Sequence, residues 1–70
     1  MSKVVNIEEE LFKKGAFLYN KREYKEALKL FSHLFLNYEK LEYKLALANT
    51  LRNLKRYKDA FIIYKKAWAR

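Results

Sequence analysis

The chain has 70 residues, no cysteine and a single histidine, His33, so neither disulfides nor a metal cage of Cys and His can stabilise it. An apolar fraction of 51% and an aromatic fraction of 17% are too high for a disordered segment. No apolar run approaches the roughly 18 residues that cross a bilayer, and the first residues lack the apolar core of a signal peptide. We therefore expect one folded domain, residues 1–70, in the cytoplasm and without a membrane span.

The net charge of +8 comes from 16 Lys and Arg residues against 8 Asp and Glu residues. Residues 1–42 contain eight basic and seven acidic residues, whereas residues 43–70 contain eight basic residues and one acidic residue, Asp59. The basic field therefore belongs to the C-terminal half, where it would attract nucleic acid or an acidic protein.

Helix is the expected structure throughout, because the chain has no proline and one glycine and is rich in helix-forming residues. The first helix is predicted to begin after Asn6, whose side chain can cap free backbone amides, with Glu9 in the capping-box position. Apolar residues then recur with helical spacing in four stretches. This spacing predicts helices near 7–20, 23–38, 41–54 and 57–69.

The sequence repeats itself with an offset of 33 residues. The offset aligns the following residues: Tyr24-Lys25-Glu26-Ala27 with Tyr57-Lys58-Asp59-Ala60, Gly15 with Ala48, Leu18 with Leu51, Asn20 with Asn53, and Phe31 with Tyr64. A period of this length is typical of stacked helical hairpins, which cannot bury their apolar faces alone. We expect an all-α fold of two helix-turn-helix hairpins, repeat 1 near 8–40 and repeat 2 near 41–70, that form four antiparallel helices of a short α-solenoid.

The repeat resembles the tetratricopeptide pattern, in which a large residue, Leu, Gly, Tyr, Ala, Phe and Pro hold fixed places in a helical hairpin. Those places are filled as follows: Leu11, Lys14, Gly15, Leu18, Ala27, Phe31 and Glu39, then Lys44, Leu47, Ala48, Leu51, Ala60 and Tyr64. Lys14 and Lys44 stand at usually apolar places, proline is absent, and the period is one residue short. A generic four-helix bundle is the alternative.

Within this family, residues 15–21, the spacing of Ala27, Phe31 and Leu34, and Tyr43 with Leu47-Ala48 resemble the first two repeats of type III secretion translocator chaperones. The resemblance implies a chaperone or co-chaperone whose concave groove holds an extended segment of a secreted protein. Those proteins carry about three repeats and this sequence contains two. A fragment, a smaller co-chaperone and an unrelated adaptor are therefore all open.

The resemblance also implies a binding groove, because the first helix of each tetratricopeptide hairpin lines the concave face. The candidate groove residues are Phe12, Ala16, Tyr19, Asn20, Leu45, Asn49, Arg52 and Asn53. The aromatic rings would take apolar side chains, and the asparagines and arginine would pair with the backbone of an extended peptide. In the alternative interpretation, Phe12 and Leu45 belong to the core and the asparagines are solvated.

The last helix is a second candidate surface, because it is apolar around more of its circumference than one neighbouring helix covers. Phe61, Ile62 and Trp68 are expected to be exposed on it. Terminal repeats normally carry a polar face, so this surface predicts self-association, a bound partner or a continuing repeat array.

Nucleic acid is the alternative ligand. The candidate basic patch consists of Lys55, Arg56, Lys58, Lys65 and Lys66. Interleaved aromatic residues could stack on bases, although the same residues hold core positions of the repeat. A membrane-surface helix over residues 57–70 is a further alternative.

Nothing in the sequence indicates an enzyme or a cofactor. His33 has no Ser or Cys nucleophile in a recognisable setting, and the carboxylates lie beside lysines. There is no glycine-rich phosphate loop and no set of paired metal ligands. We therefore expect a protein that binds another protein or peptide, with no small-molecule substrate.

Overall fold

The computed structural model describes residues 6–69, which form four α-helices: α1 (Ile7–Asn20), α2 (Tyr24–Asn37), α3 (Leu41–Asn53) and α4 (Tyr57–Trp68). Each helix boundary lies within one residue of the boundary predicted from the apolar spacing. Residues 6–69 contain no strand, so the all-α fold class is confirmed. None of the four helices combines the length and the apolar character that crossing a membrane requires.

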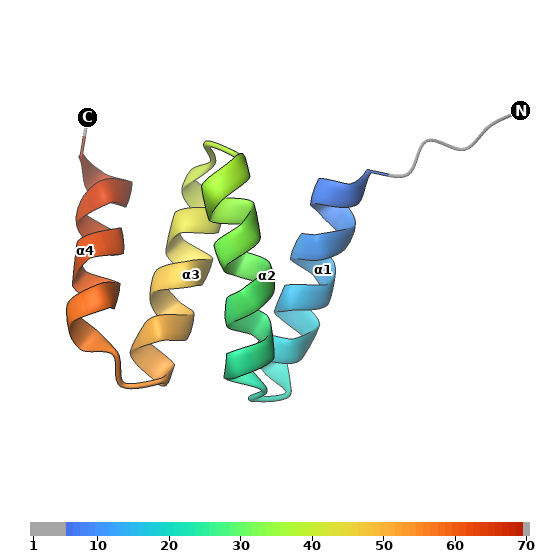
Figure 1. Cartoon of the computed structure of the whole chain (residues 1–70), viewed down its shortest axis with the longest axis horizontal. Helices are drawn as coiled ribbons and strands as arrows, with labels where there is room; N and C mark the ends of the chain where they lie inside the picture. The colour runs from blue at the N-terminus through green and yellow to red at the C-terminus, as the bar shows by residue number, and fades with distance from the viewer. Residues whose placement is uncertain (1–5, 70) are drawn as a thin grey trace, which may run out of the picture.

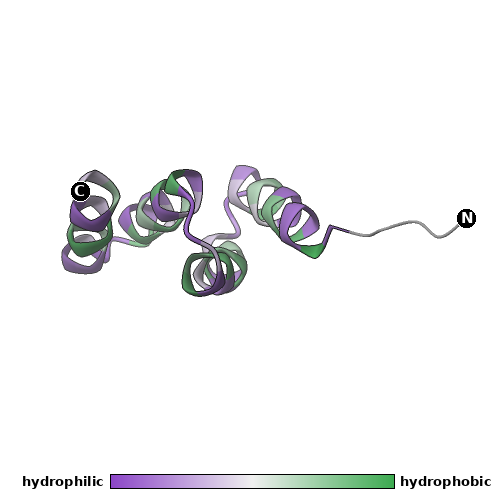
Figure 2. Ribbon diagram, turned by 90° about the horizontal axis from the view of Figure 1, so that it is seen from above, coloured by the Kyte–Doolittle hydropathy of each residue, from purple (hydrophilic) through white to green (hydrophobic). Residues whose placement is uncertain are grey.

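The four helices stand side by side in a single row, each antiparallel to the next (Figure 1). α1 packs on α2, α2 on α3, and α3 on α4. The molecule measures 47 × 31 × 14 Å, so the row is flattened along its third axis. Viewed from above, α2 is displaced to one side of the row with α1 and α3 flanking it (Figure 2). This zigzag leaves open surfaces between alternate helices.

Asn6 caps the first helix as predicted. Its side-chain oxygen accepts a hydrogen bond from the Glu9 backbone amide at 3.1 Å. The first turn also carries three glutamates, 8 to 10, whose negative charge is favourable beside the positive end of the helix dipole. The local sequence therefore determines where α1 begins.

The turns between α1 and α2 and between α3 and α4 are built alike. Arg22 and Lys55 hold the same place in the two turns, and both have left-handed backbone conformations with φ of 66° and 65°. Two backbone hydrogen bonds of 2.9 Å close each turn: Arg22 to Tyr19 and Glu23 to Leu18, then Lys55 to Arg52 and Arg56 to Leu51. The offset of 33 residues therefore relates equivalent structures as well as similar sequences.

The core runs along the row as one seam of buried apolar side chains. Its members are Ala27, Phe31, Leu34, Tyr43, Leu47, Ala48, Leu51, Ala60 and Ile63. Thr50 is the buried polar residue among them, and its hydroxyl donates to the Ala46 carbonyl at 2.8 Å. All four helices contribute to the seam through these residues or through partly buried neighbours packed against them.

Gly15 lets α1 and α2 approach closely. A Cβ atom at this position would lie 2.6 Å from the Phe31 ring, which is closer than van der Waals contact permits. Ala48 holds the equivalent place in α3 and is fully buried. The small residues at these equivalent places therefore allow neighbouring helices to pack closely.

Candidate functional site

A shallow hollow of about 200 Å³ opens between α1 and α3, with α2 beneath it. We call it the α1–α3 groove. Its lining residues are Phe12, Ala16, Tyr19, Asn20, Phe31, Ala46 and Asn49. Five of the eight predicted groove residues therefore come together in one place.

Phe12 forms an apolar wall of the α1–α3 groove. Its side chain is half-buried, and its ring centre lies 5.9 Å from that of Phe31 and 5.3 Å from that of Tyr43. These contacts make Phe12 part of the core as well as part of the groove. The two interpretations of this residue do not exclude one another.

Hydrogen bonds tie the asparagines of α3 to two tyrosines. Asn53 Nδ2 donates to the Tyr19 hydroxyl at 2.8 Å and to the Asn49 carbonyl at 2.8 Å. The Tyr64 hydroxyl donates to Asn49 Oδ1. Within residues 6–69 the Asn49 Nδ2 group donates to no other residue, so it is available to a ligand. The asparagines are therefore held in place by neighbouring side chains.

Leu45, Arg52 and Asn53 do not line the α1–α3 groove. Each follows a groove residue of α1 by 33 positions, namely Phe12, Tyr19 and Asn20 in that order. They therefore hold the same places one repeat later, where α3 forms one wall and the described chain supplies no helix opposite. Of the eight predicted residues, five therefore line the α1–α3 groove, and three lie at the equivalent surface one repeat later.

Two lining residues of the groove, Phe31 and Ala46, are not among the eight predicted ones. Phe31 is a buried core residue that also lines the groove from α2. Ala46 precedes Asn49 by three residues and so shares its helix face. That spacing was the signal that could have identified Ala46.

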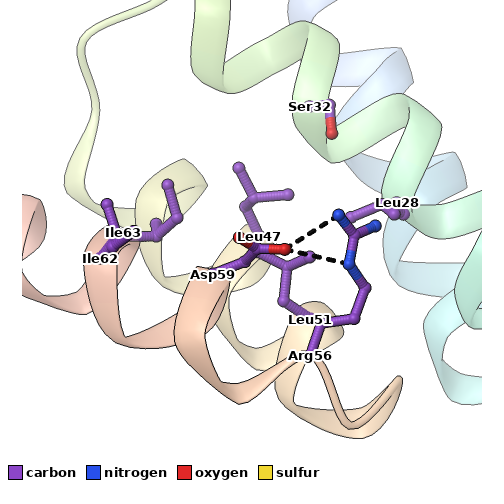
Figure 3. A pocket seen from close by; sticks show the side chains of 8 residues that line it. All are labelled: Leu28, Ser32, Leu47, Leu51, Arg56, Asp59, Ile62 and Ile63. Carbon is purple, nitrogen blue, oxygen red and sulfur yellow. Dashed lines mark hydrogen bonds and ion pairs between the residues drawn. The ribbon is translucent and has the colours of Figure 1, made fainter.

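A second hollow of about 250 Å³ lies between α2 and α4, with α3 beneath it (Figure 3). Its lining residues are Leu28, Ser32, Leu47, Leu51, Arg56, Asp59, Ile62 and Ile63. Arg56 is paired with Asp59 at its edge, where Nη2 and Nε lie 2.9 and 3.1 Å from one carboxylate oxygen. This ion pair offsets one of the charges assigned to the basic patch.

α4 carries large exposed apolar side chains on more than one side. Phe61, Ile62 and Trp68 are 62%, 51% and 73% exposed. The Trp68 ring stacks on Tyr64 with ring centres 5.9 Å apart, and the Lys65 ammonium lies 5.6 Å from the centre of the Phe61 ring. This surface is therefore a mixture of rings and positive charge.

The candidate basic patch is divided between the two ends of α4. Lys55, Arg56 and Lys58 lie at its start, and Lys65 and Lys66 lie near its end. All five side chains are exposed. Lys58 and Lys65 are seven residues apart, which corresponds to about 10 Å along the helix axis.

Glu8, Lys40 and Tyr43 form a polar cluster at the end of the row where α1 begins. One Glu8 carboxylate oxygen accepts from the Lys40 ammonium and from the Tyr43 hydroxyl, both at 2.7 Å. The hydrogen bonds from Lys40 and then Tyr43 lower the pKa of Glu8, and the bond to Glu8 raises the pKa of Lys40. Burial, followed by the bond to Glu8, raises the pKa of Tyr43 to about 12. The cluster joins α1 to the start of α3.

His33 lies on the exposed face of α2, where the Asn37 side chain donates to its backbone carbonyl at 2.8 Å. Across residues 6–69, no three His, Asp or Glu side chains gather in a way that could hold a metal ion.

Comparison of the chain with protein-family models, with curated proteins and with solved structures gives no match.

Proposed function

We propose that this chain is a tetratricopeptide-like module that binds an extended segment of a partner polypeptide in the α1–α3 groove. The observation that carries the proposal is that the apolar rings of Phe12 and Phe31 and the side-chain amides of Asn20 and Asn49 line the same groove. An extended peptide presents side chains and unpaired backbone groups in alternation. Such a groove offers a partner for each kind of group.

The size of the groove also favours a peptide. At about 200 Å³ it is smaller than the roughly 300–1,000 Å³ of most small-molecule sites. It holds one or two side chains of a ligand whose backbone continues along the row. A peptide ligand therefore fits this surface better than a metabolite.

The cellular role that agrees with this activity is that of a small chaperone or co-chaperone in the cytoplasm. The resemblance of the two repeats to type III secretion translocator chaperones supports a secreted protein as the partner. An apolar groove would keep part of such a protein from aggregating before export.

The test is selection of ligands from a phage-displayed library of random 12-residue peptides, followed by titration of the selected peptides. We expect peptides with apolar residues whose binding persists at high salt. Ala16→Arg should weaken them about tenfold or more, because a long charged side chain fills the groove. Ser32→Arg, in the hollow between α2 and α4, is the matched control and should bind normally. Equal losses from both variants would overturn the proposal.

RNA binding is the second candidate, and one observation favours it. Tyr57 and Trp68 are exposed on α4 beside Lys58 and Lys65, so rings and cations are both available to a single strand. Phosphate contacts make affinity fall steeply with salt, whereas apolar peptide binding does not. Titration of a single-stranded oligonucleotide at two salt concentrations distinguishes the two functions.

A further inference from the structure

The surface of α2 that α3 covers has an equivalent on α4. On α2, Phe31 is buried, and Leu28 and Phe35 are packed against the core seam. Leu28 shares the lining of the second hollow with Leu47 and Leu51 of α3. The first repeat therefore shows what covers this helix face, namely another helix that brings apolar side chains.

On α4 the offset of 33 residues leads to Phe61, Tyr64 and Trp68. With Tyr57 these residues follow the spacing i, i+4, i+7 and i+11, which places them in one stripe along the helix. We call them the α4 stripe. Phe61 and Trp68, which match Leu28 and Phe35, are 62% and 73% exposed, so these two positions of α4 lack the cover that their equivalents on α2 have. Tyr57 extends the stripe and is 60% exposed.

The α1 end of the row is different. The positions of α1 that match Tyr43, Ala46 and Leu47 of α3 hold Glu10, Lys13 and Lys14, which are exposed. Such a charged face cannot replace α3 on an aromatic stripe, because its charges would be desolvated without partners. Head-to-tail packing of α1 from a second copy on the α4 stripe is therefore disfavoured.

Charge also argues against two α4 helices packing on each other. Lys58 and Lys65 flank the stripe, and residues 43–70 contain eight basic residues against Asp59, which is paired with Arg56. Packing two copies through α4 would bring these lysines together. A helix with acidic flanks would instead meet opposite charge.

We propose that the α4 stripe is the docking surface for an amphipathic helix of a partner protein, whose apolar residues at i, i+3 or i+4 and i+7 are flanked by Asp and Glu. The inference rests on the proposed function, binding of a partner polypeptide, and adds the chemistry of the partner. The docked helix takes the place relative to α4 that α3 takes relative to α2. It also supplies the missing wall beside Leu45 and Arg52.

A peptide with the sequence of residues 39–54 tests this inference, because this segment forms the helix that covers α2. In the probe, Lys40 and Lys44, which flank its apolar face, are replaced by glutamate, and the unmodified peptide is the control. Trp68 is the single tryptophan of the chain, so its emission reports directly on the stripe. We expect a saturable blue shift and about tenfold tighter binding of the acidic peptide.

Two variants of the protein locate the binding surface. Phe61→Glu should weaken the acidic peptide about tenfold or more. Leu36→Glu, at a more exposed apolar position on α2, should leave the affinity unchanged. Ala16→Arg should also leave it unchanged. If the acidic peptide binds but the library yields no peptide that Ala16→Arg weakens, the groove alone is rejected. If such groove peptides are found but the acidic peptide does not bind, the docking surface alone is rejected.

Three other outcomes would overturn the inference. Equal affinity for the two peptides would remove the charge argument. A dimeric mass in light scattering, with a blue-shifted Trp68 in the absence of peptide, would assign the stripe to a second copy. A Trp68 change caused by a single-stranded RNA oligonucleotide, with no response to either peptide, would assign it to nucleic acid.

Discussion

Arg22 and Lys55 lie 33 positions apart and adopt the same left-handed backbone conformation, with φ of 66° and 65°. A side chain in this conformation is strained, because its Cβ approaches the following carbonyl oxygen, and glycine removes the strain. We predict that Arg22→Gly and Lys55→Gly each raise the free energy of unfolding by about 1 kcal/mol. Urea unfolding followed by circular dichroism measures the change.

Lys21→Gly is the matched control for the first turn. Lys21 precedes Arg22 but has a negative φ of −84°, so glycine relieves no strain there. Its greater freedom in the unfolded chain should lower the stability by about 0.5–1 kcal/mol. Effects of the same sign in Lys21→Gly and Arg22→Gly would contradict the explanation.

The contact between Gly15 and Phe31 leads to a second prediction. Gly15→Ala should destabilise the fold by about 1–3 kcal/mol, because the added methyl group overlaps a buried ring. Helix propensity alone predicts the opposite, a gain of about 1 kcal/mol. In a double-mutant cycle, Gly15→Ala should lower the free energy of unfolding less in the Phe31→Leu background than in the original protein. A stabilised Gly15→Ala protein would show that α1 and α2 are less tightly packed.

The lowered pKa of Glu8 predicts a loss of stability in acid. Its ordinary pKa is 4.5 in the unfolded chain and lower in the folded protein, so the unfolded state binds more protons between the two values. The contribution of Glu8 is present above pH 4.5 and disappears as the pH falls below it. Thermal unfolding between pH 2.5 and 7 should therefore show a weaker acid dependence in Glu8→Gln. An acid dependence of Glu8→Gln equal to that of the original protein would contradict the explanation.

Tyr43 predicts a corresponding loss in alkali. Its pKa of about 12 lies above the ordinary value of 10.0, because burial disfavours the phenolate. The folded state therefore holds the proton more firmly, and this contribution is present below pH 10 and lost as the pH rises toward 12. Tyr43→Phe should flatten the stability profile above pH 10. Tyr57→Phe, at an exposed position, should leave that profile steep.

The bond from the Tyr64 hydroxyl to Asn49 holds α4 against α3. Tyr64→Phe leaves a half-buried amide oxygen without this donor and should cost about 1–3 kcal/mol of unfolding free energy. Tyr57→Phe, whose hydroxyl belongs to an exposed side chain, should change the stability by less than about 0.5 kcal/mol. Guanidinium unfolding of the two variants tests this, and equal stabilities would show that the bond contributes little.

Much of the fold could be predicted from local features of the sequence. The apolar spacing determines the four helices, and Asn6 marks the start of α1, because both signals act within a few residues. The 33-residue offset places Phe31 and Tyr64 at equivalent positions. These relationships need no knowledge of how the helices are arranged in space.

The composition of the groove was harder to predict because it depends on the zigzag of the row. Asn49 meets α1 across α2, whereas Leu45 and Arg52 face the side on which the described chain supplies no further helix. The hydrogen bonds from Asn53 to Tyr19 and from Tyr64 to Asn49 join residues of different helices. The distance between these residues in space depends on how the helices pack, which the sequence alone does not give. Helical spacing alone could not show which residues of α3 line the α1–α3 groove and which lie on its equivalent one repeat later.

The two outer helices of the row, α1 and α4, differ in character, so the proposed docking favours addition of a further helix at α4 and not at α1. Charged side chains on α1 discourage addition at that end, while the rings of α4 favour it at the other. In the proposed docking, one helix adds at α4, and addition stops there unless that helix presents an aromatic stripe of its own. The proposal therefore favours a one-to-one complex over an open-ended fibre.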